Sequence, residues 1–405
     1  MLSIRYPSVM HTVKELPIGL WPITIKADSV PKLIVKTSKE AILTAKVRQG
    51  FLIYLIPYEH KSFKSLGFLA SFFDDPRHPY TTGGGLIKEL SGRELSKLFL
   101  SPKVDVHFFD ELGREMLSYR ATFKTDKSHR DALRSAVLPS AVNLNQAQIL
   151  HSLTEWFKLS GPMDDQRAIN VTFDEPLMPE DIIYFDMRPE NHRFHGSSGF
   201  SSFTLERDIP GPPQELEIIS LLERTFDSEC IYLAPKRTYD KEEMVDILVV
   251  TEKSVLLIQA KDNQNLESSV NQTIERKKSA AAKALKGGVG QVKGAISYLR
   301  RATPFVVILN GEELEVDVEG KAVYGLVVVK ELFDDSYDSY TPQMIELYKK
   351  TKVPCIPLSF GELHNYTRFI QGDDEFFKAF MKVFEHGLDT GAFLRLRVHP
   401  KGAVI

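Results

Sequence analysis

Short runs of apolar residues, bounded by polar and turn-forming residues, dominate the C-terminal half of the chain. Runs of four to eight such residues predict β-strands, whereas apolar residues spaced three and four apart predict helices. The predicted strands span 230–235, 245–250, 254–261, 305–309, 323–329 and 353–358. The predicted helices span 214–226, 279–301, 341–350, 360–370 and 374–386, with a break in the second at 287–290. This order predicts an α/β core (α-β-β-β-α-β) whose mixed sheet is covered by helices on both faces.

The N-terminal half has a different pattern, which is mixed but rich in strands. Residues 51–58 predict a strand, and 105–123 predict a hairpin with Gly113 in its turn. Residues 143–159 have apolar positions at helical spacing. Residues 75–86 contain three consecutive glycines among other turn formers, which predicts a flexible loop.

A stretch rich in Gly, Ser and Pro separates the two patterns. Proline and glycine at this density disfavour the interiors of both helices and strands. We therefore predict a mixed, β-rich domain over 1–190, a linker over 191–213, and an α/β domain with a C-terminal helical extension over 214–405. No residue-level pattern shows what the first domain does, and a targeting or sensing role is the expectation.

Composition narrows the class of protein without deciding its function. The chain has 405 residues, of which 43% are hydrophobic and 26% charged, and its formal net charge of −3 predicts no general affinity for polyanions. Cys230 and Cys355 are the two cysteines, and we expect both to be reduced thiols. The apolar runs are strand-sized, and the N-terminus lacks a signal-peptide pattern, so the expected location is cytoplasmic with no membrane partner.

The sequence VDILVVTEKSVLLIQAKD, residues 245–262, places polar groups at one end of two apolar strands. If Glu252 and Lys253 form the turn, Asp246 lies opposite Gln259, and Lys261 shares a strand face with Gln259. Polar side chains at the end of strands buried on both faces are costly unless they are paired or bind a ligand. The simpler interpretation is a surface ion pair at strand ends that reach solvent.

These residues resemble the PD-(D/E)xK nuclease superfamily, in the variant with glutamine in the second motif. The nearest likeness is to Mrr-type restriction endonucleases and NERD-type domains, over about 211–310. The resemblance implies that Asp246 is the strand-borne acid and that Gln259 and Lys261 form the Gln-x-Lys motif. It also implies a glutamate from the first helix. Glu215 and Glu217 compete for this role, and Glu215 is favoured because it begins the pattern E-x-x-I-x-x-L-L. Two further positions bear on the match: Gln291 fits a glutamine expected early in the second helix, and Val245 replaces the proline that often precedes the aspartate.

A site of this kind would hydrolyse a phosphodiester bond with the help of Mg²⁺ or Mn²⁺. Asp246 would be the main metal ligand, and Glu215 would bind directly or through water. The Gln259 side-chain oxygen and the Ala260 carbonyl would complete the protein ligands. Lys261 would orient the attacking water and stabilise developing negative charge. Because glutamine is neutral, we expect a single metal ion that binds weakly without phosphate.

Local charge favours a polyanion near this site. Residues 271–301 contain eight Lys or Arg residues and one acid, whereas 312–346 contain ten acids and two lysines. The basic stretch is expected to contact nucleic-acid phosphates through Lys277, Lys278, Lys283, Lys286, Gln291 and Lys293. A solvated helix face is the alternative. The acidic stretch should face away from nucleic acid, or mimic it toward a protein partner.

The leading hypothesis from the sequence is therefore a metal-dependent endonuclease acting on double-stranded DNA. The resemblance implies a role in restriction or defence. The N-terminal domain would bind a second copy of the chain or another protein. A second hypothesis is a catalytically inactive nuclease fold that binds DNA or protein, because glutamine in place of an acid is also what loss of activity would leave. A third is a structural interaction protein in which the motif is accidental.

Overall fold

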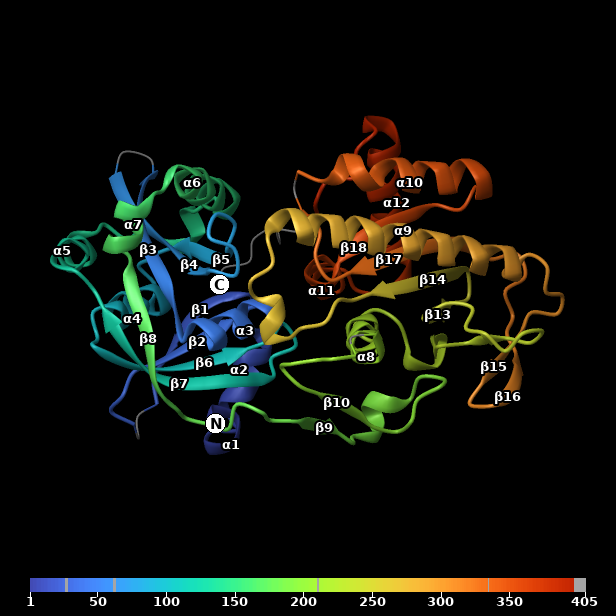
Figure 1. The fold of residues 1–405 in the computed structure, drawn as a ribbon, viewed down its shortest axis with the longest axis horizontal. Helices are drawn as coiled ribbons and strands as arrows, with labels where there is room; N and C mark the ends of the chain where they lie inside the picture. The colour runs from blue at the N-terminus through green and yellow to red at the C-terminus, as the bar shows by residue number, and fades with distance from the viewer. Residues whose placement is uncertain (26–27, 61–62, 210, 334, 397–405) are drawn as a thin grey trace.

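Two α/β halves lie side by side in the computed structural model, which describes residues 1–25, 28–60, 63–209, 211–333 and 335–396 (Figure 1). Each half is built on one large sheet and has its own buried apolar cluster. The predicted α/β class is therefore confirmed. Within these residues, no helix is both long and apolar enough to cross a membrane.

The N-terminal sheet is mixed and has eight strands, in the order β1-β2-β6-β7-β8-β3-β4-β5. Its neighbours are antiparallel except for the parallel pair β2 and β6. In chain order the strands are β1 Gly19–Ile23, β2 Lys32–Lys36, β3 Gly50–His60, β4 Phe63–Phe72, β5 Tyr80–Gly85, β6 Lys103–Phe109, β7 Glu115–Lys124 and β8 Ile169–Pro176. The helices of this half are α1 Leu2–Arg5, α2 Val9–Glu15, α3 Lys39–Arg48, α4 Leu90–Phe99, α5 Lys127–Ser135, α6 Gln146–Leu159 and α7 Pro162–Arg167.

Two predictions for this half have opposite outcomes. The hairpin is present as β6 and β7, and Gly113 has φ +78° in its turn, a conformation that favours glycine. The predicted loop over 75–86 is wrong in its second part, because its three glycines lie in the edge strand β5. A Cβ atom on Gly83 would lie 2.3 Å from the carbonyl oxygen of Phe68 on β4. That glycine therefore permits close strand pairing and does not mark a flexible loop.

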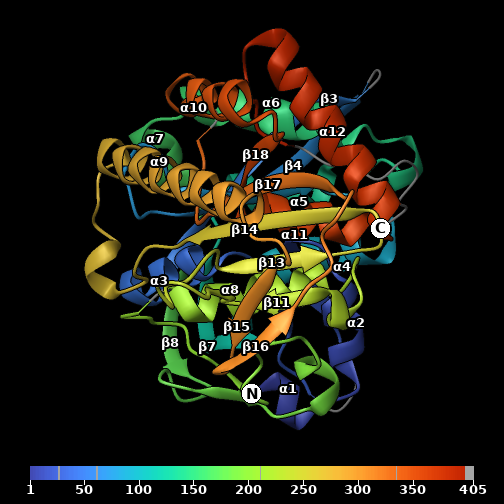
Figure 2. The same ribbon diagram turned by 90° about the vertical axis from the view of Figure 1, so that its right-hand side faces the viewer.

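The C-terminal sheet has five strands in the order β11-β13-β14-β17-β18. They are β11 Ile231–Leu233, β13 Ile247–Val250, β14 Ser254–Lys261, β17 Ala322–Val329 and β18 Cys355–Ser359. The first three pair antiparallel, and the last three pair parallel. The helices are α8 Gly211–Leu222, α9 Ile274–Leu299, α10 Tyr337–Thr351, α11 Phe360–Phe369 and α12 Asp373–Thr390. Helices α9 and α8 cover opposite faces of β14 (Figure 2).

The element order differs from the prediction at one strand. The predicted strand over 305–309 exists as β15 Val306–Leu309, but it pairs with β12 Lys236–Arg237 and β16 Glu312–Glu315 in a separate small sheet. The strand that follows α9 in the main sheet is β17, parallel to β14. Neighbouring parallel strands need a crossover connection, and here α9 together with β15 and β16 supplies it, which makes the connection longer than expected.

The predicted break in the helix at 287–290 is also wrong, because α9 is continuous from Ile274 to Leu299. Gly288 faces the sheet, where an added Cβ atom would lie 2.5 Å from Val327 Cγ1 and 3.5 Å from Lys261 Cγ. Gly287 and Gly290 have no atom within 4 Å of such a Cβ. Glycine at 288 thus lets the helix approach β14 and β17 closely.

Residues 191–209 connect the two halves and pack against both, and α8 begins at Gly211, three residues before the predicted start of this helix. The short strands β9 Tyr184–Asp186 and β10 Ser201–Phe203 form a two-stranded sheet in this region. Phe194 is buried in the C-terminal core, and Leu205 in the N-terminal core. The high content of Gly, Ser and Pro therefore does not exclude short regular elements or buried side chains in this segment.

Candidate active site

The β13–β14 hairpin has the predicted register. Ile247 pairs with Ile258 and Val250 with Val255, and the Thr251 N–H group donates to the Ser254 carbonyl at 2.9 Å to close the two-residue turn. Asp246 therefore lies opposite Gln259 at the end of the ladder. β14 continues to Lys261 with β17 as its neighbour, so its last residues pass beyond the end of β13.

Asp246 lies at this end and is held in a fixed position. Its side chain is nearly buried, and its Oδ2 atom accepts a hydrogen bond of 2.7 Å from the Ala260 N–H group. Lys261 Nζ lies 4.0 Å from the same oxygen. Burial raises the pKa of Asp246, while Lys261, the Ala260 N–H group and the Gln259 amide act to lower it. The structure thus brings together the three groups that the sequence predicted.

Glu215, in the first turns of α8, lies near enough to Asp246 for their charges to interact. Burial raises its pKa to about 8, and the negative charges of Asp246 and Glu243 act in the same direction. Burial and Asp246 likewise raise the pKa of Glu243. Carboxylates that raise one another's pKa form a site with too little positive charge, which a bound cation would supply. Glu243 was missed from the sequence, although its place three residues before Asp246 could have suggested it.

Glu217 points to a different environment, which separates the two competing glutamates. It is buried and forms ion pairs with Lys39, with Arg114 at 2.5 Å and with Arg207 at 3.3 Å. These three cations hold its pKa far below the ordinary range for a glutamate. Glu217 therefore joins the two halves of the chain, since Lys39 and Arg114 come from the N-terminal sheet region.

The backbone at Ala260 is oriented toward Asp246. The N–H and C=O groups of one strand residue point to the same side of the strand, and successive residues alternate. The Ala260 N–H group points to Asp246. The Lys261 carbonyl points the other way and accepts a hydrogen bond of 3.2 Å from the Lys330 N–H group, directly after β17. The Ala260 carbonyl hence points to the Asp246 side, beyond the end of β13.

Gln259 is buried beside Asp246 with part of its hydrogen-bonding capacity unused. Its exposed fraction is 1%, and its Nε2 group makes no hydrogen bond with the described residues. The amide still lies close enough to stabilise the Asp246 charge. A buried amide N–H left in this state costs free energy, which a ligand with an acceptor oxygen, such as a phosphate, would recover.

The donor groups near Asp246 are of the chemical type that binds Mg²⁺. In the part of the chain that the structure describes, no three His, Cys, Asp or Glu side chains are close enough to form a metal site by themselves. Mg²⁺ keeps several waters and commonly binds one or two carboxylates together with substrate phosphate. Asp246, Glu215 and the Ala260 carbonyl would supply such oxygen ligands.

The predicted phosphate-binding residues on α9 fall into two groups. Lys277 is ion-paired with Asp74 of the N-terminal half, and Lys278 lies 2.5 Å from Asp335. The remaining residues are exposed along the rest of the helix and are Lys283, Lys286, Gln291 and Lys293. Gln291 was predicted to lie early in a helix. It lies instead in the second half of α9, which begins at Ile274 and is unbroken. A Cβ atom added to Gly288 would lie 3.5 Å from Lys261 Cγ, so α9 passes close to the Lys261 side chain at this residue.

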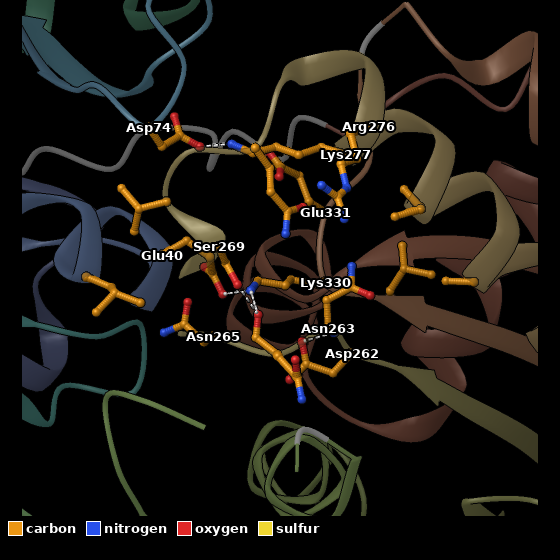
Figure 3. A pocket seen from close by; sticks show the side chains of 18 of the residues that line it. Glu40, Asp74, Asp262, Asn263, Asn265, Ser269, Arg276, Lys277, Lys330 and Glu331 are labelled. Atoms are coloured by element: carbon orange, nitrogen blue, oxygen red, sulfur yellow. Dashed lines mark hydrogen bonds and ion pairs between the residues drawn. The ribbon is translucent and has the colours of Figure 1, made fainter. Parts of the chain in front are cut away.

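A cavity of about 440 Å³ adjoins Lys261 and separates the two halves at this point (Figure 3). One wall is α9 and the end of β14, and the other is α3 with the region of Asp74 and Tyr80. In Figure 3, Lys277 reaches Asp74 across the cavity, and Lys330 lies beside Glu40. Comparison with family models, with curated proteins and with solved structures finds no match. The function proposed below therefore rests on the site and its sequence pattern.

Proposed function

We propose that the chain is a metal-dependent nuclease that hydrolyses phosphodiester bonds in DNA. The observation that carries this proposal is the convergence of Asp246, Gln259 and Lys261 at the end of the β13–β14 hairpin, with Glu215 near enough for the Asp246 charge to raise its pKa. A surface ion pair alone would not explain why Gln259 is buried with an amide nitrogen that makes no hydrogen bond, or why the charges of two other carboxylates raise the pKa of Glu215.

The fold supports the proposal through its element order. Within the main sheet, helix α8 is followed by the antiparallel strands β11, β13 and β14, then by α9 and, after the small sheet strands β15 and β16, by the parallel strand β17. The resemblance to PD-(D/E)xK nucleases implies a helix, three strands, a helix and a strand, with the acid at Asp246 and Gln-x-Lys at residues 259–261. Asp246 directly precedes β13, and Lys261 is the last residue of β14.

Each side chain has a distinct role in the proposed reaction. The Asp246 carboxylate, fixed by the Ala260 N–H group, would hold the cation, with Glu215 as a second oxygen donor. When bound, Mg²⁺ would lower the pKa of a coordinated water and polarise the phosphate. The Lys261 ammonium group, 4.0 Å from Asp246, would orient that water and stabilise negative charge as it develops on the phosphate.

The same geometry gives Glu215 a defined protonation change. Its pKa of about 8 leaves it mostly protonated at neutral pH when Asp246 and Glu243 are its nearest charges. A nearby dication would favour the carboxylate and release the proton. The neutral Glu215 carboxyl would therefore contribute little to metal binding, and its charged form would contribute more once the metal ion and the phosphate are both present.

A cleavage assay with paired variants tests the proposal. We expect the protein to cut linear or supercoiled DNA in Mg²⁺ or Mn²⁺, and Asp246→Ala and Lys261→Ala to lower the rate by about 100-fold or more. Lys253→Ala, at the turn of the same hairpin, and Asp317→Ala, on an exposed loop, serve as matched controls and should retain the parental rate.

Two other outcomes would contradict the proposed activity. Binding of DNA without cleavage, weakened by salt and by loss of Lys283 and Lys286, would favour the catalytically inactive nuclease fold. Equal cleavage by the parent and by Asp246→Ala would place the activity at another site or in a contaminant.

A further inference from the structure

The cavity beside Lys261 exists because one face of α9 carries small side chains. Ala280 and Ala284 line the cavity, and Gly288 follows at the same four-residue spacing against β17. Larger residues at these helix positions would fill the space between α9 and the N-terminal half. The run of small residues in SAAAKALKGG therefore creates an open chamber next to the proposed catalytic lysine.

The charges around the cavity are equal in number but are not equally paired. Its four acids all have a partner in the protein: Asp74 pairs with Lys277, Glu40 with Lys330 at 3.2 Å, Asp262 with Arg207 at 3.2 Å, and Glu331 accepts from the Tyr80 hydroxyl at 3.1 Å. Two of its cations remain available. Arg276 makes no side-chain hydrogen bond or ion pair with the described residues, and Lys261 makes only a long ion pair with Asp246, at 4.0 Å. The lining thus offers two positive groups to an anionic ligand.

The rest of the lining is suited to a polar, planar ligand of moderate size. Asn263, Gln264 and Gln272 bring amide groups to the cavity, while Leu43, Val270 and Ala281 form apolar wall. A volume of about 440 Å³ lies within the range of sites that enclose a small molecule. Amides that can donate and accept hydrogen bonds, together with apolar wall, are the groups that recognise a nucleobase outside a helix.

We infer that this cavity receives one nucleotide of the substrate strand, with its phosphate at Lys261 and Arg276 and its base among the amides. This inference rests on the proposed nuclease function and extends it, because it specifies an unstacked nucleotide as the form that reaches the site. Both halves of the chain wall the cavity, so an intact duplex, whose major groove alone is about 12 Å wide, cannot enter it. Single-stranded DNA satisfies this requirement without the cost of unpairing a base.

Binding measurements in EDTA test the cavity without cleavage. The probes are a short fluorescein-labelled single-stranded DNA and the same sequence as a duplex, with deoxyadenosine monophosphate and inorganic phosphate as competitors. Ala284→Leu fills the cavity and Arg276→Ala removes a cation. Ala282→Leu, on the same helix but outside the lining, and Arg134→Ala, exposed on α5, are the matched controls.

We expect single-stranded DNA to bind at least about tenfold more tightly than the duplex. Ala284→Leu and Arg276→Ala should each weaken the single-strand complex by about tenfold or more, while both controls stay within about twofold. The mononucleotide should compete better than phosphate alone. Equal affinity of Ala284→Leu and Ala282→Leu for the single strand, or tighter binding of the duplex, would overturn the inference. Binding of the mononucleotide without any binding of the strand would also overturn it and indicate a free nucleotide ligand.

A parallel cleavage assay in Mg²⁺ separates this inference from the proposed function. If Ala284→Leu loses single-strand binding but the parent cuts no DNA, the cavity assignment holds and the nuclease proposal fails. If the parent cuts DNA and Ala284→Leu cuts the single strand as fast as Ala282→Leu does, the nuclease proposal holds and the cavity assignment fails. Thermal melting of both leucine variants shows whether either has lost its fold.

Discussion

Glu215 and Glu217 lie two residues apart on α8, yet the structure predicts opposite effects when each is changed to glutamine. Glu217 is buried among Lys39, Arg114 and Arg207, and its replacement would leave these buried cations with too little negative charge. Breaking a buried ion pair in this way costs about 3–5 kcal/mol. Glu217→Gln should therefore lose a large part of the protein's stability, which is typically about 5–15 kcal/mol.

Glu215→Gln should leave the fold intact and remove activity. Since the pKa of Glu215 is raised from 4.5 to about 8, its ionisation opposes folding at neutral pH. Glutamine resembles the neutral acid and carries no such penalty, so at pH 7 without metal the variant should gain up to about 3 kcal/mol, less the effect of solvent screening. DNA cleavage should fall by about tenfold or more, because an oxygen donor with charge is lost.

Urea unfolding in EDTA at pH 7 measures both effects. With a slope of about 3 kcal/mol per M, Glu217→Gln should lower the midpoint by about 1–2 M, and Glu215→Gln should leave it unchanged or raise it. A Glu217→Gln midpoint equal to that of the parent, or a larger loss for Glu215→Gln than for Glu217→Gln, would refute the assignment of the two side chains.

Three further predictions concern pH, packing and thiol reactivity. The folded pKa of Glu215 exceeds its unfolded value, so this carboxyl should reduce metal-free stability progressively as pH rises from about 4.5 to about 8. The stability gained by Glu215→Gln should therefore grow across that range. A stability difference that does not change with pH would contradict this prediction. Gly290→Ala should stabilise the protein by up to about 1 kcal/mol. In urea unfolding, Gly288→Ala should be less stable than Gly290→Ala by about 1–3 kcal/mol, because its new methyl group would clash with Val327. Equal unfolding midpoints of the two variants would count against close packing of α9. Cys355 is fully buried, and burial raises the pKa of its thiol to about 12. It should therefore not react with a maleimide until the protein unfolds. Labelling of Cys355 in the native protein would contradict this prediction.

The sequence was most informative where local rules act alone. The hairpin register over 245–262 follows from two apolar runs and a two-residue turn, and it placed Asp246 opposite Gln259 correctly. Of the two competing glutamates, Glu215 is the one whose pKa is raised by Asp246, whereas Glu217 is held by three cations; the helical pattern alone left both open.

Sequence rules failed where tertiary contacts decide. Glycines at 287, 288 and 290 suggested a break, but the helix continues because its packing on β17 needs a residue without a side chain at Gly288. Glycines 83–85 suggested a loop but form an edge strand. Neither the position of β15 outside the main sheet nor the pairing of Lys277 with Asp74 could be read from periodicity, because both depend on contacts between segments far apart in the chain.

Calorimetric titration of the protein with Mn²⁺ at pH 7, repeated in buffers of different ionisation enthalpy, tests the central claim most directly. If Asp246 and Glu215 hold one divalent cation, binding should show a single site and release close to one proton, because Glu215 loses its proton when the ion arrives. Asp246→Ala should abolish this binding, and Asp317→Ala should not. Binding of equal strength in Asp246→Ala, or no binding by the parent even with a DNA strand present, would contradict the account.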